Sequence, residues 1–246
     1  MTRPDGRRPD RLRPLDFTWD VAPNALASIL LKCGGTQVIT AVSAEDSVPK
    51  WKEKQGLPGG WLTAEYSMLP YSTADRKPRD ITKGKLDGRS QEIQRLIGRS
   101  LRAAINLESL GPRSLWIDCD VLAADGGTRT TAITAGFLAL KLACHRLRQT
   151  GALPSDPLLS PVAATSVGLY QEVPILDLCY LEDRDATVDM NVVMTAQGQF
   201  IELQASGEEA TFSPDQLEQL LALARQGITQ LLNFQRKAWR ARPTSN

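Results

Sequence analysis

The sequence predicts an α+β protein, a mixed α/β sandwich in which helices pack against a sheet. Two observations support this class. First, the expected elements follow one another as two rounds of strands, each ended by a helix. Second, the apolar residues recur every second position in the expected strands and every three to four positions in the expected helices. The composition, 42% hydrophobic and 23% charged, is typical of a globular protein. A length of 246 residues allows one large domain or two small ones.

The first round of elements begins after a basic segment. Met1 to Arg13 carries five arginines against two aspartates, and we interpret it as an extended arm that contacts RNA, contacts a neighbouring subunit or is solvated. Leu26–Lys32 and Thr36–Ser43 are predicted strands joined by a short glycine connection. Residues 48–60 are predicted to form a polar loop, and Leu62–Leu69 a third strand.

A basic loop and an amphipathic helix are expected next. Residues 71–85 have almost no apolar content, which is typical of a loop. If this loop has a function, we expect it to be a mobile contact with nucleic acid. Gly88 to Leu107 carries an apolar stripe at helical spacing. Arg89 stands in its first turn, where an anion binds most readily, whereas other arginines of the helix are explained equally well as a solvated face. The arginines considered besides Arg89 are Arg76 and Arg79 in the loop and Arg95, Arg99 and Arg102 in the helix.

The central stretch is the strongest candidate for an anion site. Leu115–Leu122 alternates as a half-buried strand, residues 123–127 form a turn containing Gly126 and Gly127, and a helix is expected to begin close to Arg129. A helix N-terminus offers free N–H groups and a positive dipole end to an anion. An ordinary strand-to-helix turn explains the glycines alone, but Arg129 beside Thr128 favours phosphate. No Gly-Lys-Ser/Thr follows, so this is not a Walker loop.

The second round carries carboxylates inside apolar strands. Strand interiors are depleted in Asp, so Asp177 and Asp189 are unusual, whereas a turn explains Asp183 and Asp185. We expect a hairpin with Asp177 in one arm, Asp183 in its turn and Asp189 in the other arm. Clustered carboxylates hold magnesium or act as a general acid. The predicted elements are strands at Ala163–Leu169, Ile175–Leu181, Thr187–Thr195 and Phe200–Ser206, and a helix at Pro214–Trp239 capped by Ser213 with Gln216.

Charge and composition narrow the function classes. The net charge of +1 hides a basic block of +6 between Arg76 and Arg102 and an acidic block of −8 between Glu172 and Glu209. Together these blocks suit a polyanion on one side and carboxylate chemistry on the other. The single histidine, His145, excludes a two-histidine ribonuclease mechanism. No apolar run reaches the ~18 residues of a membrane span, the N-terminus lacks a secretory signal, and the four scattered cysteines indicate a reducing, cytoplasmic setting.

The chain resembles the bacterial ribonuclease PH family of phosphate-dependent 3′-to-5′ exoribonucleases. The resemblance runs nearly end to end, through RPDGRRPDRLRP, GWLTAEYSMLP, GRSQEIQRLIGRSLRA, IDCDVLAADGGTRTTAIT, LEDRDATVDMNVVMT and GEEATF. It implies a ribosomal-protein-S5-domain-2-like fold of two βαβ-type halves with helices on mixed sheets. It also implies one domain over residues 1–246, with a basic arm at 1–13 and a tail at 240–246. The implied assembly is a homohexamer, a trimer of dimers.

The resemblance also implies the activity and its residues. Extra nucleotides are trimmed from the 3′ ends of tRNA precursors as nucleoside diphosphates, reversibly, with inorganic phosphate as co-substrate and Mg²⁺ as cofactor; a part in rRNA processing is a further implication. The family's phosphate site falls on Arg89, Gly127, Thr128 and Arg129, and its essential aspartates on Asp177 and Asp183. Asp183 is the general acid or a magnesium ligand, and Asp177 positions the metal or Asp183. Arg76 and Arg79 match the family's loop for subunit association and tRNA contact.

The sequence departs from the family pattern at two places, and two other functions remain open. Tyr71 stands where an arginine is usual, which removes one basic contact, and Ala205-Ser206 stands where Gly-Thr is common. A non-catalytic RNA-binding ring subunit is the first alternative, but the phosphate arginines and the aspartates are all retained. A small-molecule kinase of related fold ranks low, because the glycine–serine phosphate loop is missing.

Overall fold

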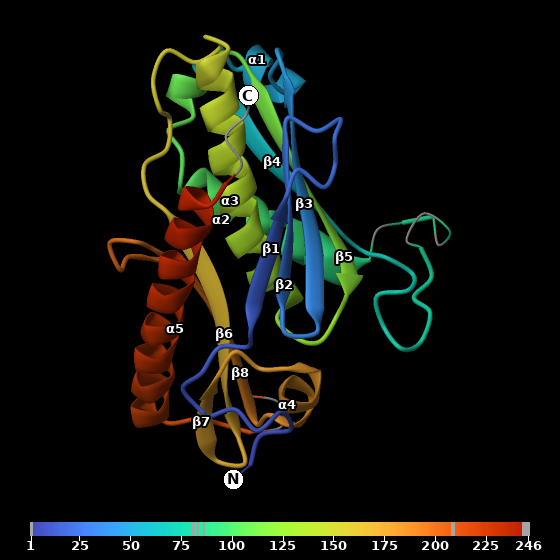
Figure 1. Cartoon of the computed structure of the whole chain (residues 1–246), viewed down its shortest axis with the longest axis vertical. Coiled ribbons are helices and arrows are strands. Elements are labelled where there is room, and N and C mark those ends of the chain that lie inside the picture. The colour runs from blue at the N-terminus through green and yellow to red at the C-terminus, as the bar shows by residue number, and fades with distance from the viewer. Residues whose placement is uncertain (1, 80–81, 83, 86, 208–209, 243–246) are drawn as a thin grey trace.

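Two β-sheets of different strand order form the framework of the protein (Figure 1). The structure is a computed structural model that describes residues 2–79, 82, 84–85, 87–207 and 210–242. Lys83 and residues 208–209, which belong to the predicted charge blocks, and residues 243–246 of the predicted tail lie outside the described residues. None of the helices in the described part of the chain is long and apolar enough to cross a membrane.

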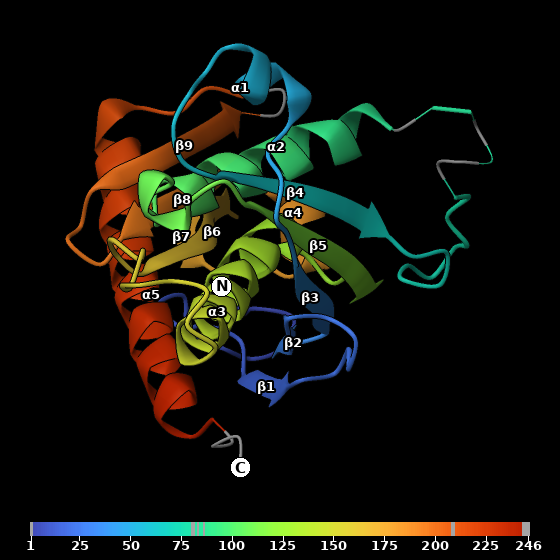
Figure 2. The same ribbon diagram turned by 90° about the horizontal axis from the view of Figure 1, so that it is seen from above.

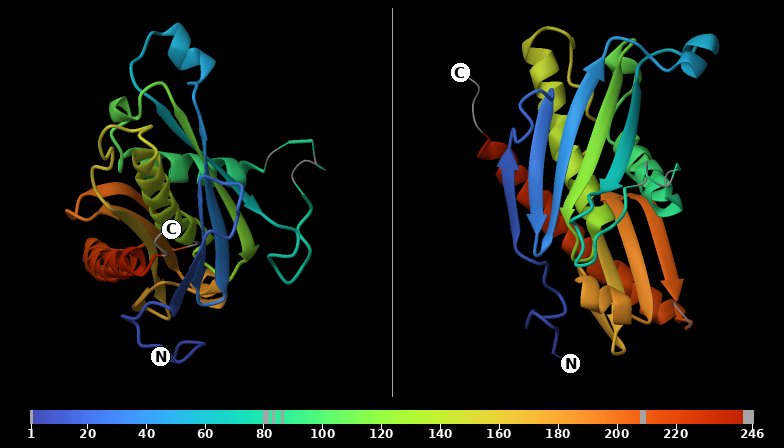
Figure 3. Two further views of the ribbon diagram at one scale, coloured as in Figure 1. Left: turned by 45° about the horizontal axis from the view of Figure 1, so that its top comes forward. Right: turned by 90° about the vertical axis from the view of Figure 1, so that its right-hand side faces the viewer.

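The first sheet has five strands in the order β1-β2-β3-β5-β4 (Figure 3). Its neighbours run antiparallel except for β4 and β5, which are parallel and are connected through α2 as a βαβ unit. The predicted glycine hairpin is confirmed between β2 and β3. The strands are β1 (Leu15–Trp19), β2 (Ala27–Cys33), β3 (Thr36–Glu45), β4 (Trp61–Met68) and β5 (Ser114–Ala123).

Three local elements of the first half differ from the predictions. β1 was not expected, although Leu15, Phe17 and Trp19 alternate with polar residues; the strand is short, lies at the edge of the sheet and follows directly after the arginine-rich arm. The short helix α1 (Lys50–Lys54) lies inside the predicted polar loop. Helix α2 (Gly88–Arg102) ends before Leu107, because Ile105 forms a β-bridge with Leu158 and the Asn106 N–H donates to the Pro157 carbonyl. The 3₁₀ helix η2 (Glu108–Leu110) follows, and the Asn106 side chain accepts hydrogen bonds from its backbone.

The second sheet has four antiparallel strands in the order β7-β6-β8-β9. They are β6 (Val162–Tyr170), β7 (Val173–Leu176), β8 (Val188–Thr195) and β9 (Phe200–Gly207). Helix α5 (Pro214–Arg240) packs along β6 and β7, and the predicted capping box of Ser213 and Gln216 is present at its start. The α+β class is therefore confirmed.

The predicted hairpin around Asp183 is wrong. β7 and β8 do not pair with each other, because β6 lies between them. β7 ends at Leu176, where Asp177 adopts a positive φ of 56° and turns the chain out of the sheet. The segment that follows is the helix α4 (Tyr180–Asp185), which begins with a capping box between Cys179 and Glu182. Asp183 is thus helical.

Helix α3 (Thr128–Gln149) joins the two sheets. It packs on β2 and β3 of the first sheet and on β6 of the second, and most of its residues are buried (Figure 2). A helix that is apolar nearly all round belongs in a protein interior. The first turn of α3 and the start of α4 are therefore both attached to the framework that α3 and the two sheets form.

Candidate active site

The glycine turn (residues 125–128) carries the chain from β5 into α3. Gly126 and Gly127 have φ values of 75° and 62°, a conformation that glycine adopts without strain. A Cβ added to Gly126 would lie 2.5 Å from the carbonyl oxygen of Leu178, so only glycine allows the turn to approach α4 this closely. No side chain caps the first N–H groups of α3, which are left for another partner. The predicted strand, turn and helix start are confirmed.

A pocket of about 490 Å³ opens beside the glycine turn. Met68, residues 73–75, Arg89, residues 124–128, Tyr180 and Asp183 line it. Of the six residues predicted for phosphate binding and catalysis, four therefore face one cavity: Arg89, Gly127, Thr128 and Asp183. The lining combines the Arg89 guanidinium and the N–H groups of the glycine turn with the carboxylate of Asp183 in α4, and Asp75 and Asp125 contribute two further carboxylates. Such a pocket suits a phosphate group beside an acid.

Tyr66 supports the glycine turn from below. Its hydroxyl lies 2.8 Å from the Thr128 Oγ1, and its side chain is buried. Burial raises the pKa of Tyr66, although the hydrogen bond to Thr128 and the nearby charges of Arg89 and Arg129 oppose that rise. The phenol therefore stays protonated and holds the Thr128 hydroxyl at the mouth of the helix. No sequence pattern predicts this contact, since it joins strand β4 to the first residue of helix α3.

Arg129 belongs to the first turn of α3, but its guanidinium does not line the pocket. Its Nη1 lies 3.3 Å from a Glu92 carboxylate oxygen and 3.1 Å from the Gln204 Oε1. The Glu92 side chain is 44% exposed, so this ion pair is weak. Arg129 nonetheless directly follows the glycine turn in the chain, and its charge opposes the rise in the pKa of Tyr66.

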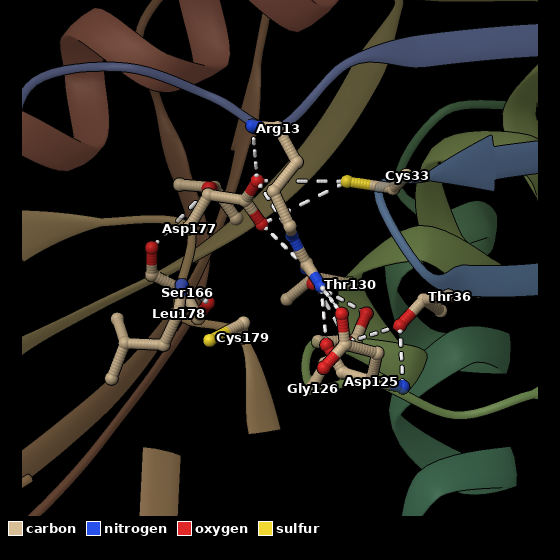
Figure 4. Close-up of polar contacts among 12 residues, drawn as sticks. Arg13, Cys33, Thr36, Asp125, Gly126, Thr130, Ser166, Asp177, Leu178 and Cys179 are labelled. Carbon is tan, nitrogen blue, oxygen red and sulfur yellow. Dashed lines mark hydrogen bonds and ion pairs between the residues drawn. The ribbon is translucent and has the colours of Figure 1, made fainter. Parts of the chain in front are cut away.

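Asp177 lies behind the pocket, where its carboxylate is bound by Arg13 (Figure 4). One carboxylate oxygen accepts hydrogen bonds from the Arg13 backbone N–H at 2.7 Å and Nε at 3.0 Å, and the other accepts one from Nη2 at 2.7 Å. Burial alone would raise the pKa of Asp177, but Arg13 and Arg7 hold it below the usual range. Beside this pair, burial and the Asp177 charge raise the pKa of the Cys33 thiol to about 12.

The N-terminal arm is only partly what the sequence predicted. Arg8 and Arg11 are exposed, as expected for a solvated segment. Arg3 and Arg13 are instead 2% and 3% exposed and pair with carboxylates of the second half. The sequence did not predict this, although acidic residues within an apolar stretch imply buried cationic partners somewhere in the chain.

The remaining predicted residues lie around the pocket rather than in it. Arg76 and Arg79 are exposed on the segment that projects from the body of the protein beyond β4 (Figure 1). Arg95 and Arg99 line a separate hollow of about 220 Å³ on α2 and β4. Asp189 stands in β8 opposite Gly168 and Ser206. His145 packs edge-to-face against Trp239 with ring centroids 5.5 Å apart, as expected for a structural histidine.

This fold and this pocket agree with the comparisons with known proteins. Residues 11–145 match the model of domain 1 of the 3′ exoribonuclease family, and residues 160–227 match that of domain 2. The chain therefore belongs to the 3′ exoribonuclease family. Two solved structures share the fold at about 20% identity. Rice Rrp46 has a TM-score of 0.78 over 97% of this chain and 100% of its own, and an Archaeoglobus fulgidus exosome subunit 0.79 over 94% and 92%.

The sequence relatives are closer and carry the name ribonuclease PH. The protein of Halalkalibacterium halodurans is 52% identical over 237 residues, which cover 96% of this chain and 91% of that relative. The protein of Solibacter usitatus is 51% identical over 235 residues, 96% of this chain and 98% of its own length. The resemblance to ribonuclease PH is therefore confirmed, and with it the expected phosphate-dependent 3′-to-5′ exoribonuclease activity at tRNA ends.

Proposed function

We propose that the pocket between the glycine turn and α4 is the centre where inorganic phosphate attacks the 3′ end of RNA. The observation that carries this proposal is that Arg89, Thr128 and Asp183 line one cavity although they come from three separate elements. The pocket takes one wall from each family-matched region. We therefore treat residues 1–246 as one functional unit.

Phosphate binds on the wall formed by the first half. Arg89 supplies a guanidinium, and the glycine turn supplies the uncapped N–H groups of α3 and the Thr128 hydroxyl. Arg129 joins them by exchanging its weak contact with Glu92 for the anion. These cations offset the repulsion between inorganic phosphate and the RNA phosphate that it attacks.

The reaction breaks one bond and forms one bond at phosphorus. A phosphate oxygen attacks the phosphorus of the last phosphodiester, the bond from phosphorus to the O3′ of the preceding nucleotide breaks, and that oxygen takes up a proton. The products are a nucleoside diphosphate and an RNA shorter by one nucleotide. We assign proton donation to Asp183, which lines the same pocket as Arg89. Asp177 faces Arg13 instead, which favours the positioning role for this residue.

The pocket can hold Mg²⁺ only if phosphate groups of the substrate supply some of the ligands. The described residues hold no group of three or more His, Cys, Asp or Glu side chains arranged for a metal. Proteins commonly hold Mg²⁺ by one or two carboxylates together with substrate phosphates, and Asp183 can provide one of these. When bound, the ion neutralises charge on the reacting phosphates. The oxygens of Asp177 are already occupied by Arg13, so Asp177 fits a metal less well.

We base the substrate, the oligomeric state and the cellular location of the protein on its family membership. We propose that tRNA precursors reach the pocket along the exposed arginines Arg76, Arg79, Arg95 and Arg99, because residues 73–75 at the base of the projecting segment already line it. We further propose a homohexamer, whose neighbouring subunits contact the same segment. A cytoplasmic setting suits the four cysteines, all of which are buried free thiols.

Two substitutions test this assignment through the rate of nucleoside diphosphate release from a tRNA with a 3′ extension. Arg89→Ala is expected to raise the KM for phosphate on the order of 10- to 100-fold, because a charge-assisted contact is lost. Asp183→Asn is expected to lower kcat about 10²- to 10⁴-fold. If Asp183 acts only through Mg²⁺, raising the Mg²⁺ concentration restores part of that rate; if it is the acid, the rate stays low.

Matched controls share the charge and exposure of the tested residues. Asp185→Asn changes an exposed carboxylate of the same helix, and Arg148→Ala an exposed arginine far along α3. Both are expected to leave the kinetics unchanged. Full phosphorolysis by Asp183→Asn, or an unchanged phosphate dependence in Arg89→Ala, would contradict the proposed site.

A further inference from the structure

The N-terminal arm separates its arginines into exposed and buried ones. In the part of the chain that the structure describes, the side chains of Arg8 and Arg11 are 71% and 57% exposed and pair only with neighbouring Asp10. Arg3 and Arg13, in contrast, are almost completely buried. Burying a guanidinium costs several kcal/mol unless ion pairs and hydrogen bonds offset that cost. The buried arginines must therefore have specific partners.

Arg13 joins one wall of the pocket, the glycine turn, to Asp177 of the second half (Figure 4). Toward the second half, its backbone N–H and its guanidinium bind both oxygens of Asp177. Toward the first half, its Nη1 donates to the carbonyl of Asp125 and its Nη2 to that of Gly126 at 3.4 Å. A Cβ on Gly127 would lie 3.0 Å from the same Nη2, so the guanidinium lies directly under the glycine turn.

Arg3 holds the other wall together with Arg7, whose Nη2 lies 3.6 Å from the Glu182 Oε2 and donates to the Asp177 carbonyl at 3.1 Å. Its Nε and Nη2 donate to the two carboxylate oxygens of Glu182 at 2.6 and 2.7 Å, a bidentate pair, and Glu182 is the residue before Asp183 in α4. The remaining donors of Arg3 reach the carbonyls of Leu176 at 2.9 Å and Asp177 at 3.0 Å. Glu182 also accepts from the Cys179 N–H at 2.9 Å, so the same carboxylate caps α4 and fixes it to the arm.

We infer that Arg3 and Arg13, the arginine clamp, are positioning residues that set the separation between the phosphate-binding wall and the Asp183 wall. This inference rests on the proposed assignment of the pocket. Neither arginine lines the cavity, so each acts through the groups that it holds. Arg13 fixes the glycine turn against Asp177, and Arg3 fixes α4. Reacting groups displaced by about 1 Å lose on the order of 10²-fold in rate, so such a clamp matters for catalysis.

The two arginines have different expected effects because they hold different walls. Loss of the Arg13 fork releases the carbonyls of the glycine turn and with them the phosphate N–H groups, so both KM for phosphate and kcat change. Arg3 binds α4 and the carbonyls of Leu176 and Asp177 rather than the glycine turn, so its loss lowers kcat while KM for phosphate is retained. A role confined to folding would instead lower the active fraction and leave KM unchanged in both variants.

Lysine substitutions test this difference, because lysine keeps the charge and loses the planar fork. Phosphorolysis is measured on a 3′-extended tRNA over a series of phosphate concentrations, with thermal unfolding measured on the same samples. Arg13→Lys is expected to raise KM for phosphate and to lower kcat, each about 10-fold, and Arg3→Lys to lower kcat about 10-fold with an unchanged KM. Arg8→Lys and Arg11→Lys, exposed arginines of the same arm, serve as controls.

A chemical rescue and a double variant keep the test informative if a single variant misfolds. Adding millimolar guanidinium to Arg13→Ala is expected to restore part of the phosphate affinity, whereas sodium at equal ionic strength does not. If Arg13→Lys does not fold, Arg13→Gln with Asp177→Asn removes both charges together and keeps a neutral hydrogen-bonded pair. That double variant is expected to fold and to show the raised KM.

Wild-type KM and kcat per folded molecule in Arg13→Lys, or in the folded double variant, would overturn the clamp. Arg89→Ala, measured in parallel, separates this failure from failure of the proposed site. If Arg89→Ala loses phosphate affinity while the clamp variants do not, the pocket is correct and only the clamp is wrong. If Arg89→Ala also behaves as wild type, the pocket assignment itself fails.

Discussion

The two walls of the pocket are built in different ways. The glycine turn is local: four consecutive residues between β5 and α3 supply the N–H groups, the hydroxyl and the backbone shape. The wall that carries Asp183 is assembled from distant parts of the chain, because α4 is held by Arg3 and Asp177 is held by Arg13. An anion needs only a helix end and a cation. An acid must also be held at a fixed distance from the anion, and buried ion pairs provide that restraint.

Removing the buried carboxylate should have the largest effect on stability. Asp177→Asn leaves the Arg13 guanidinium buried without its counter-charge, and we expect a loss of about 4 kcal/mol in the free energy of unfolding. Asp185→Asn, in an exposed pair with Arg184, is expected to cost no more than about 0.5 kcal/mol. Urea denaturation measures both. Equal stability losses in the two variants would show that the second wall does not depend on its buried pair.

Asp177→Asn is also expected to change how the free energy of unfolding depends on pH in the acid range. The pKa of Asp177 is lowered from 3.8 in the folded protein, against burial, by Arg13. A carboxyl with a depressed folded pKa stabilises the protein above its unfolded pKa and loses that contribution as the pH falls through the folded value. The wild type should therefore lose stability below about pH 4, and Asp177→Asn should lose less over the same range. Parallel acid curves for the two proteins would contradict this.

The close approach of the two walls should produce the next largest effect. Gly126→Ala places a Cβ 2.5 Å from the carbonyl oxygen of Leu178 at a φ of 75°. Gly151→Ala has the same φ and no atom within 4 Å, so it measures the backbone strain alone. We expect a cost of about 1 kcal/mol for Gly151→Ala and about 3 kcal/mol for Gly126→Ala, with slower phosphorolysis only in the latter. Equal costs would mean that the walls can move apart freely.

The smallest effect is expected below the glycine turn. Tyr66→Phe removes the hydroxyl that lies 2.8 Å from the Thr128 Oγ1 and frees that side chain to rotate. Loss of one such hydrogen bond is worth about 1 kcal/mol, so KM for phosphate should rise about fivefold. Tyr170→Phe, on β6 outside the pocket, is the control. An unchanged KM in Tyr66→Phe would limit the orienting role to backbone N–H groups.

The same contrast explains which features the sequence could predict. The glycine turn was identified from residues 115–129 alone, because strand alternation, paired glycines and helical spacing lie in one continuous stretch. Arg89 was also identified locally, as a cation in the first turn of a helix. The capping box at Ser213 and Gln216 is a third such case. Each depends on interactions within a few residues.

Features that depend on distant contacts were missed or predicted wrongly. Asp183 was expected in a hairpin turn, because Ile175–Leu181 has strand composition, but the positive φ of Asp177 ends β7 and the Cys179–Glu182 capping box starts a helix. The burial of Arg3 and Arg13 cannot be read from an arm that is rich in arginine, proline and aspartate. It becomes clear only when the arm meets carboxylates more than 160 residues away.

Locating the phosphate directly tests the proposed site best. A crystal of the enzyme soaked with arsenate, a phosphate analogue whose arsenic scatters anomalously, would show where the anion binds. We predict an anomalous peak within hydrogen-bond distance of the Arg89 guanidinium and the N–H groups of the glycine turn. A peak confined to the hollow at Arg95 and Arg99, with none beside the glycine turn, would contradict the account.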